Sequence, residues 1–254
     1  MRLALAIAVW FAAMLPAAAE DLAAGISRDQ IEIRSNFTGT DVVVFGAIEN
    51  EFGQAFPATE PRDVVVVVRS DRPYTVTVRK KERVGPIFVN REMRRFADVP
   101  GFYFLASTRP LKEIAQGAVL DQFELGLDRI ALGPAPGSIG GPRDFREAIV
   151  RTKQRQELYS QHEGGVSFLS GSLFRTTVAL PPNVPAGNLK VLVYVFANGE
   201  VTSSNSMTLF IDKKGIERGV SDLSHKQPVL YGLAAVLLSA LAGFLGYLAF
   251  RERG

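Results

Sequence analysis

Two apolar segments at the ends of the chain limit its fold more than any motif between them. Lys226 is the last charged residue before Arg251, and the 22 residues 229–250 lie between them. As an α-helix they would rise roughly 33 Å, enough to cross a hydrocarbon core of about 30 Å. We therefore expect a transmembrane helix over 229–250, after a juxtamembrane linker over 213–228 and before a cytoplasmic tail over 251–254.

The N-terminal segment has the pattern of a secretory signal. Met1 and Arg2 precede an apolar run over 3–15, and Pro16 is followed by three alanines. The run is short for a membrane span and ends in an A-x-A site, so residues 1–19 are predicted to be a cleaved signal peptide. The alternative is an uncleaved N-terminal anchor. Because no second long apolar stretch follows before the C-terminal one, we do not expect this chain alone to form a channel or transporter.

Composition argues for a packed domain without thiol or metal chemistry. Hydrophobic residues make up 47% of the chain and cysteine is missing from the sequence. Disulfides, thiol catalysis and thiolate zinc sites are thereby excluded. Of the two histidines, only His162 is expected in the folded part, because His225 lies beside the apolar C-terminal segment. We expect no catalytic residues, no metal site and no cofactor, and so no enzyme.

Charge is polarised along the sequence although the formal net charge is only +3. Residues 20–60 carry eight acids and two bases, whereas residues 62–95 carry ten bases and four acids. Because the basic block is balanced by an acidic one and the chain is predicted to be exported, we do not expect nucleic-acid binding.

The N-terminal β region, residues 20–109, shows short strand patterns. The run Asp63 to Arg69 holds five consecutive valines, so both faces of that strand should be buried, either inside a sandwich or beneath a helix. Other strands are expected over residues 30–34, 42–48, 74–78, 86–89 and 102–106.

A helical insertion is predicted over residues 110–163. Leu120, Phe123, Leu127 and Ile130 recur at spacings of three and four, which favours one helix whose apolar stripe faces the core. After a loop over 133–142, a second helix is expected from Asp144 to Gln161.

Strands return over residues 164–212 and complete the sandwich. The expected strands cover 166–180, with a break at Ser170-Gly171, then 188–196 and 207–211, and Asn198-Gly199 indicates a tight hairpin. This ending is similar to the closing hairpin of immunoglobulin-like and fibronectin-like sandwiches. The predicted fold is mainly β, an Ig-like sandwich with a helical insertion and one C-terminal transmembrane helix. The sequence does not decide whether the strands form one β domain or two.

Three stretches resemble one known family across nearly the whole chain. They are Val89-Asn90-Arg91-Glu92 with Arg95 to Tyr103, then Ala106 to Leu111, and the tail residues Leu230-Tyr231-Gly232 and Phe250-Arg251. The chain resembles the alphaproteobacterial family of putative single-pass transmembrane proteins. That resemblance implies an inner-membrane protein with a periplasmic domain, and no catalytic residues. Members are similar to proteins encoded beside sulfite-exporter-type permeases, which implies an accessory role in transport, such as small-anion export.

The basic segment is the candidate contact site of the soluble part. Asn90, Arg91, Arg94 and Arg95 are expected in a connection between two strands, where arginine forks suit an oxyanion. A solvated connection with internal ion pairs is the alternative. Likewise, Arg79 to Arg83 would contact anionic lipid headgroups or simply protect an exposed hairpin edge. An alternative function is therefore a solute- or lipid-sensing module.

Small residues form a stripe on the predicted transmembrane helix, at spacings of three and four. Such a face lets another helix approach closely, although a passive anchor would also tolerate it. The expected partner is a polytopic, permease-like inner-membrane protein, with a homo-oligomer as the alternative. The face comprises Gly232, Ala235, Ser239, Ala242 and Gly246.

Overall fold

The computed structural model describes residues 21–49, 62–84, 86–134, 143–213 and 228–251. Strands far outnumber helices among them, which confirms the expectation of a mainly β protein. The predicted signal peptide lies outside the described residues, as do most of the linker and the last three residues of the tail.

The chain divides into two compact units. The larger comprises residues 1–31 and 38–211, and the smaller comprises residues 32–37 and 212–254. The smaller unit holds α6 (Pro228–Arg251), a helix that matches the expected helix to within one residue at each end.

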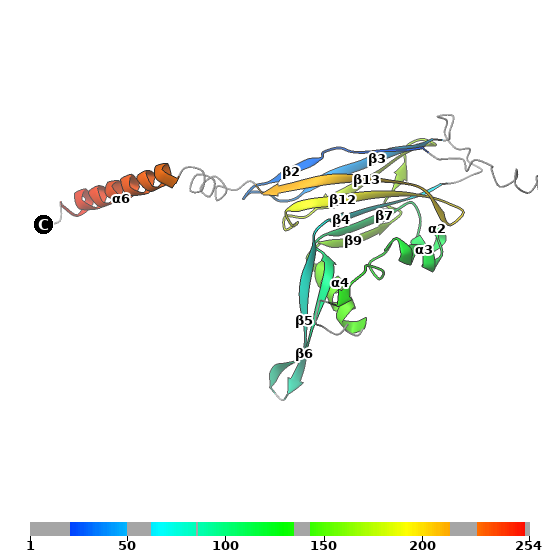
Figure 1. Cartoon of the computed structure of the whole chain (residues 1–254), viewed down its shortest axis with the longest axis horizontal. Helices are drawn as coiled ribbons and strands as arrows, with labels where there is room; N and C mark the ends of the chain where they lie inside the picture. The colour runs from blue at the N-terminus through cyan, green and yellow to red at the C-terminus, as the bar shows by residue number, and fades with distance from the viewer. Residues whose placement is uncertain (1–20, 50–61, 85, 135–142, 214–227, 252–254) are drawn as a thin grey trace, which may run out of the picture. The chain divides into compact units, whose positions relative to one another are not determined.

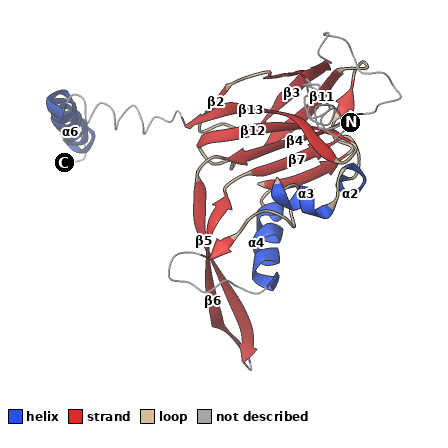
Figure 2. Ribbon diagram, turned by 45° about the vertical axis from the view of Figure 1, so that its right-hand side comes forward, coloured by secondary structure: helices blue, strands red, loops and turns tan. Residues whose placement is uncertain are grey.

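Two sheets account for most of the strands (Figures 1 and 2). The strands of the first are β1 (Asp21–Ile26), β3 (Thr40–Glu49), β10 (Ser167–Phe168) and β11 (Leu173–Leu180). Those of the second are β2 (Gln30–Ile33), β4 (Asp63–Ser70), β7 (Tyr103–Ser107), β9 (Tyr159–Glu163), β12 (Gly187–Ala197) and β13 (Glu200–Lys213). The strand orders are β1-β3-β11-β10 and β2-β13-β12-β4-β7-β9.

Side-chain alternation shows where the core lies. Strand β11 buries every second residue, Phe174 to Leu180, and β3 buries Val42, Val44 and Ile48. One face of each of these strands is therefore solvated and the other is packed, which is consistent with two sheets in a β-sandwich. The Ig-like assignment is not confirmed, and the second sheet includes a parallel pair, β7 with β9.

The five valines of β4 are at most 2% exposed, as predicted for a strand buried on both faces. On one face Val66 pairs with Val193 of β12 and with Ala106 of β7. On the other face Val65 pairs with Tyr194, whose ring packs 5.2 Å from that of Phe123, just after helix α3 (Gly117–Gln122). The residue after α3 thus covers one face of the sheet beside this strand, and the burial of the other face is consistent with a β-sandwich.

The predicted long helix over residues 108–130 is wrong. Instead, α2 (Leu111–Ile114) and α3 are short, and the backbone turns left-handed at Glu124 (φ 55°) and Gly126 (φ 126°). Of the predicted stripe, Leu120 and Ile130 are buried and Phe123 and Leu127 are half-buried, so the apolar spacing marked core residues only in part and did not mark one continuous helix.

The second predicted helix is too long. Helix α4 (Arg143–Arg155) ends because Glu157 adopts φ 59°, and β9 begins at Tyr159. Strand β9 lies beside β7, where the hydroxyl group of Tyr159 donates a 2.7 Å hydrogen bond to the carbonyl of Pro100. Sheet pairing therefore overrides the helix propensity of this segment.

A third sheet consists of a long hairpin that extends away from the other two (Figures 1 and 2). Its strands are β5 (Pro73–Val84), β6 (Ile87–Pro100) and β8 (Gly133–Pro134). The predicted strands over 74–78 and 86–89 were thus far too short, and the charged residues after Val89 lie within β6 rather than in a connection. A two-stranded ribbon exposes much of both faces, so it accommodates charged side chains along its length.

The Asn198-Gly199 hairpin is confirmed. Both residues have positive φ, 52° and 86°, as a two-residue type I′ turn requires. Strand β13 starts directly after this turn, seven residues earlier than predicted.

Candidate functional site

Tyr103 of β7 holds the segment from Asp121 to Leu132 against the second sheet. The Tyr103 hydroxyl donates to the carbonyl of Glu124 at 3.0 Å and accepts from the backbone N–H of Gly126 at 3.1 Å. Burial raises the pKa of Tyr103, so it stays a neutral donor at ordinary pH. The carboxylate of Glu124 also pairs with Arg69 at 2.6 Å, which ties the same turn to β4.

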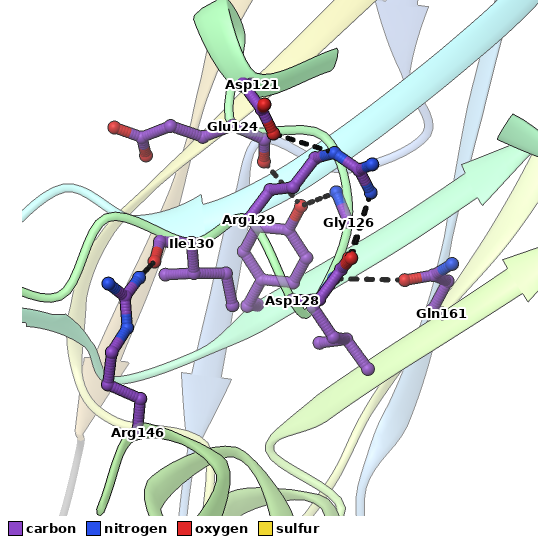
Figure 3. Close-up of polar contacts among 10 residues, drawn as sticks. Asp121, Glu124, Gly126, Asp128, Arg129, Ile130, Arg146 and Gln161 are labelled. Carbon is purple, nitrogen blue, oxygen red and sulfur yellow. Dashed lines mark hydrogen bonds and ion pairs between the residues drawn. The ribbon is translucent and has the colours of Figure 1, made fainter. Parts of the chain in front are cut away.

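Two arginines stabilise this segment, Arg129 from within it and Arg146 from α4, as Figure 3 shows. Arg129 pairs with Asp121 at 2.8 Å and with Asp128 at 3.0 Å. Arg146 of α4 reaches back and donates a 3.0 Å hydrogen bond to the carbonyl of Ile130. Helix α4 is therefore joined to the segment by a charge-assisted contact.

A cleft of about 780 Å³ lies between this segment and α4. Apolar side chains, Leu127, Ile130, Leu132 and Val150, make up part of its lining. The rest is polar or charged: Asp128, Arg143, Arg146, Glu147, Arg151 and Gln154. Such a volume would hold a small organic molecule.

Two of the charged side chains that line the cleft have partners within it or beside it. Arg143 pairs with Glu147 at 3.0 Å, and Arg146 donates its hydrogen bond to the carbonyl of Ile130. Among the described lining residues, Asp128 and Glu147 carry carboxylates, and none is serine, threonine, cysteine or histidine. Within the described parts of the chain, no group of three or more acidic or histidine side chains is placed to hold a metal ion.

Sequence reasoning missed this cleft. The spacing of Arg143, Glu147, Val150 and Gln154 puts them on one side of a helix, while Phe145 and Ile149 are buried. This side of the helix could have been identified from the sequence. The position of the 127–132 segment, which forms the opposite wall of the cleft, could not, because it depends on the left-handed turn before it.

A second cluster joins the start of β4 to the end of β7. Arg109 donates to both carboxylate oxygens of Asp63, through Nε at 2.9 Å and through Nη2. The Thr108 hydroxyl donates to Asp63 Oδ1 at 2.8 Å and accepts from the N–H of Val64 at 3.2 Å. Burial raises the pKa of Asp63, but the bonds from Arg109 and Thr108 and the charge of Arg109 outweigh it and hold the pKa below 3.8, the ordinary value.

We predict that Asp63→Ala lowers the free energy of unfolding by about 2 kcal/mol at neutral pH, because it removes charge-assisted bonds from a half-exposed arginine. Since the folded-state pKa of Asp63 is depressed, its stabilisation is complete above the ordinary carboxyl pKa and is lost as pH falls through the folded value. Denaturant melts of wild type and variant should therefore converge in acid. A difference that stays constant from neutral pH into acid would contradict this role.

The predicted basic site lies in β6. Arg94 pairs with Val78 and Arg95 with Thr77, so as neighbours in a strand they point to opposite faces. Asn90 pairs with Lys81, and Arg91 lies at the bulge between Lys80 and Lys81. Arg95 is exposed, and the Nε of Arg94 is buried without a hydrogen-bond partner among the described residues. The strand geometry does not gather these four residues around one anion, and the anion site stays a prediction.

The predicted packing face lies on α6. Gly232, Ser239 and Ala242 are exposed, and a Cβ added at Gly232 would have no atom within 4 Å. Ala235 and Gly246 belong to the same helix, but their burial is outside the described residues. At 100° per residue the five small residues share one side of the helix.

Comparison with known proteins identifies the family. A family described as "Putative transmembrane protein (Alph_Pro_TM)" matches residues 21–252. The chain belongs to this family. Its membership confirms the resemblance seen in the sequence; an association with permeases is not shown. No curated protein matches the chain.

Among solved structures, the chain is similar to the crystal structure of Spo0M, a sporulation control protein from Bacillus subtilis. The two are 10% identical with a TM-score of 0.27, and the match covers 77% of this chain and 50% of that one. A likeness this weak carries no argument about fold or function.

Among the described residues, none of the helices combines the length and hydropathy of a membrane span.

The segments that carry the family resemblance have structural roles. Phe96, Val99 and Phe102 are at most 1% exposed, and a Cβ at Gly101 would lie 2.6 Å from the Tyr74 ring. In the second segment, the Ser107 hydroxyl donates to the carbonyl of Arg109 at 2.7 Å, beside the Asp63 cluster. These residues hold the strands together.

Proposed function

We propose that this member of the family is a non-catalytic interaction protein, anchored in the inner membrane by α6. Its β unit would lie in the periplasm and its C-terminus in the cytoplasm. The observation that carries the proposal is the character of α6. From Val229 to Phe250 it has no charged residue, and its large apolar side chains are exposed, between 55% for Leu245 and 83% for Val229.

An exposed helix of this kind needs an apolar environment. Placing Leu, Ile, Phe or Val at the centre of a membrane helix is favourable by about 0.3 to 0.6 kcal/mol per residue. In water the same side chains would form an apolar patch of the kind that marks a membrane or protein contact. The family description, which refers to a transmembrane protein, supports the membrane.

The shifted pKa values support a role without catalysis. Tyr103 and Tyr159 have raised pKa values because they are buried, and both hydroxyls bond backbone groups that fix the fold. Asp63 holds two chain segments together. All three groups make contacts that stabilise the fold, although Asp63 and Arg109 also line a cleft of about 360 Å³.

The small-residue side of α6 is the proposed contact for a polytopic membrane partner, with self-association as the alternative. A more specific role, as accessory to a small-anion exporter, has no support from the fold or the comparisons and stays a prediction.

Affinity purification tests the partner. The full-length, C-terminally tagged protein would be purified from native membranes in mild detergent and its companions identified by mass spectrometry. We expect a stoichiometric polytopic protein that disappears from the triple variant Gly232→Leu, Ser239→Leu, Gly246→Leu. The control replaces Leu233, Leu237 and Leu241, on the opposite side of the helix, with Ile and should retain the partner. Equal recovery from both variants would contradict the proposed contact.

A further inference from the structure

We infer that the outer part of the β5–β6 hairpin docks onto the surface of an anionic lipid bilayer. Basic side chains would contact the headgroups, and the uncharged end of the hairpin would enter the interface. The inference rests on the proposed function for the presence of a membrane and adds a contact separate from α6.

The hairpin is held firmly at its base. Its register runs from Pro73 with Pro100 to Val84 with Ile87, and at about 3.3 Å per residue β5 is roughly 40 Å long. Near the base, Phe96 and Val99 are buried, and β8 pairs with β6 at Phe96. Helix α4 packs against β5 at Val78 to Lys80. Beyond these contacts the hairpin extends away from the two sheets (Figure 2).

Positive charge is concentrated on both strands beyond the base. Residues 79–95 contain seven bases and two acids. In the antiparallel register Lys81 pairs with Asn90 and Arg83 with Phe88, and Arg91 lies at the bulge beside Lys81, so bases of both strands lie near the end of the hairpin, while Lys80 is opposite Glu92. Arg79, Lys80, Arg83 and Arg95 are exposed. Each basic residue near an anionic bilayer strengthens binding by about fivefold, so this charge complements such a surface.

The end of the hairpin has the opposite character. Val84 and residues 86–89 (Pro, Ile, Phe, Val) carry no charge, and the register places them at the turn. Pro86 is exposed, and so is Met93, at 52%, among the basic residues. Protection of a soluble edge strand explains lysine and arginine, and Gly85-Pro86 is an ordinary turn sequence, but neither explains the apolar residues beside it, Val84, Ile87, Phe88 and Val89. An apolar end with a basic collar matches the layers of an anionic bilayer interface.

A fluorescent probe at the end of the hairpin tests the inference, and the chain's lack of cysteine makes single labelling straightforward. The full-length Pro86→Cys protein, labelled with an environment-sensitive dye, would be reconstituted in vesicles of equal parts phosphatidylcholine and phosphatidylglycerol. We expect a blue shift and quenching by nitroxide-labelled lipid, and neither in phosphatidylcholine alone. A probe at Gln122→Cys, exposed on α3, should stay in water in both.

Charge variants separate specific docking from chance contact. Lys81→Gln, Arg83→Gln and Arg91→Gln, the three bases within four residues of the Val84–Ile87 pair, should together lower the ratio of docked to undocked hairpin about a hundredfold. The matched control neutralises three exposed bases elsewhere, Arg28, Lys112 and Arg155, and should leave that ratio unchanged.

A probe at Leu238→Cys in α6 makes the two possible failures distinguishable. If this probe is in the bilayer while the Pro86 probe stays in water in anionic vesicles, the hairpin inference is overturned and the anchor stands. If the Leu238 probe is in water, the proposed anchor fails. Equal insertion of the hairpin into neutral vesicles would overturn the role given to its charges.

Discussion

Replacing Leu237 and Leu241 with arginine should release the protein from membranes. Both side chains are exposed on α6, at 60% and 59%, in the middle of the apolar stretch. Each arginine at the centre of a membrane helix costs about 3 kcal/mol by insertion measurements, and each lost leucine adds to that. The pair should thus cost about 6 kcal/mol or more. Wild type should stay in the membrane pellet after alkaline carbonate extraction, and the variant should move to the supernatant.

The matched control exchanges the same two residues for isoleucine, which keeps the stretch apolar, and it should remain in the pellet. If the arginine variant also resists extraction, α6 does not hold the protein in the membrane.

Gly46→Val should destabilise the larger unit by about 3 kcal/mol. Gly46 lies on the buried side of β3, where a Cβ would stand 2.6 Å from Phe174 Cζ and 2.7 Å from the carbonyl oxygen of Ala23. The phenyl ring can turn aside, but the carbonyl belongs to the neighbouring strand β1 and cannot move without disturbing its pairing. Denaturant unfolding of the purified protein, followed by far-ultraviolet circular dichroism, would measure the decrease in the free energy of unfolding.

Gly117→Ala is the control for this substitution. Gly117 begins α3, and a Cβ there would have no atom within 4 Å. Alanine also has the better helix propensity, so the variant should be as stable as wild type or slightly more so. A neutral Gly46→Val variant would contradict the close packing of β3 against β1.

The strands that could be predicted are those whose pattern is local. The valines of β4 and the Asn198-Gly199 turn each specify their structure within a few residues, and both are confirmed. Strand β1 was not predicted, because Asp21 to Ile26 is rich in alanine and becomes a strand through its pairing with β3. The length of β5 and β6 was missed for a related reason. Charged residues on a ribbon lack the apolar alternation by which a half-buried strand is recognised.

The helical region shows the other limit of sequence reasoning. The periodic residues Leu120 and Ile130 are buried, but Glu124 and Glu157 adopt left-handed conformations that are uncommon for residues other than glycine. Nothing local indicates those breaks. The partners that hold the segments, Tyr103 for Glu124 and β7 for β9, are distant in sequence.

The candidate site was predictable only in part. The basic character of residues 79–95 is evident from composition, whereas its placement on one long hairpin required the strand pairing. The cleft beside α4 and the Asp63–Arg109 pair join residues that are far apart in the chain, so no sequence spacing could reveal them.

The most direct test of the account is the topology of the full-length protein in intact cells. Single cysteines at Gln122 and Gly254 would be treated from outside with a maleimide that passes the outer membrane but not the inner one. We predict labelling at Gln122 in intact cells, and at Gly254 only after the inner membrane is opened. Labelling of both sites in intact cells, or of neither, would contradict a periplasmic β unit anchored by α6.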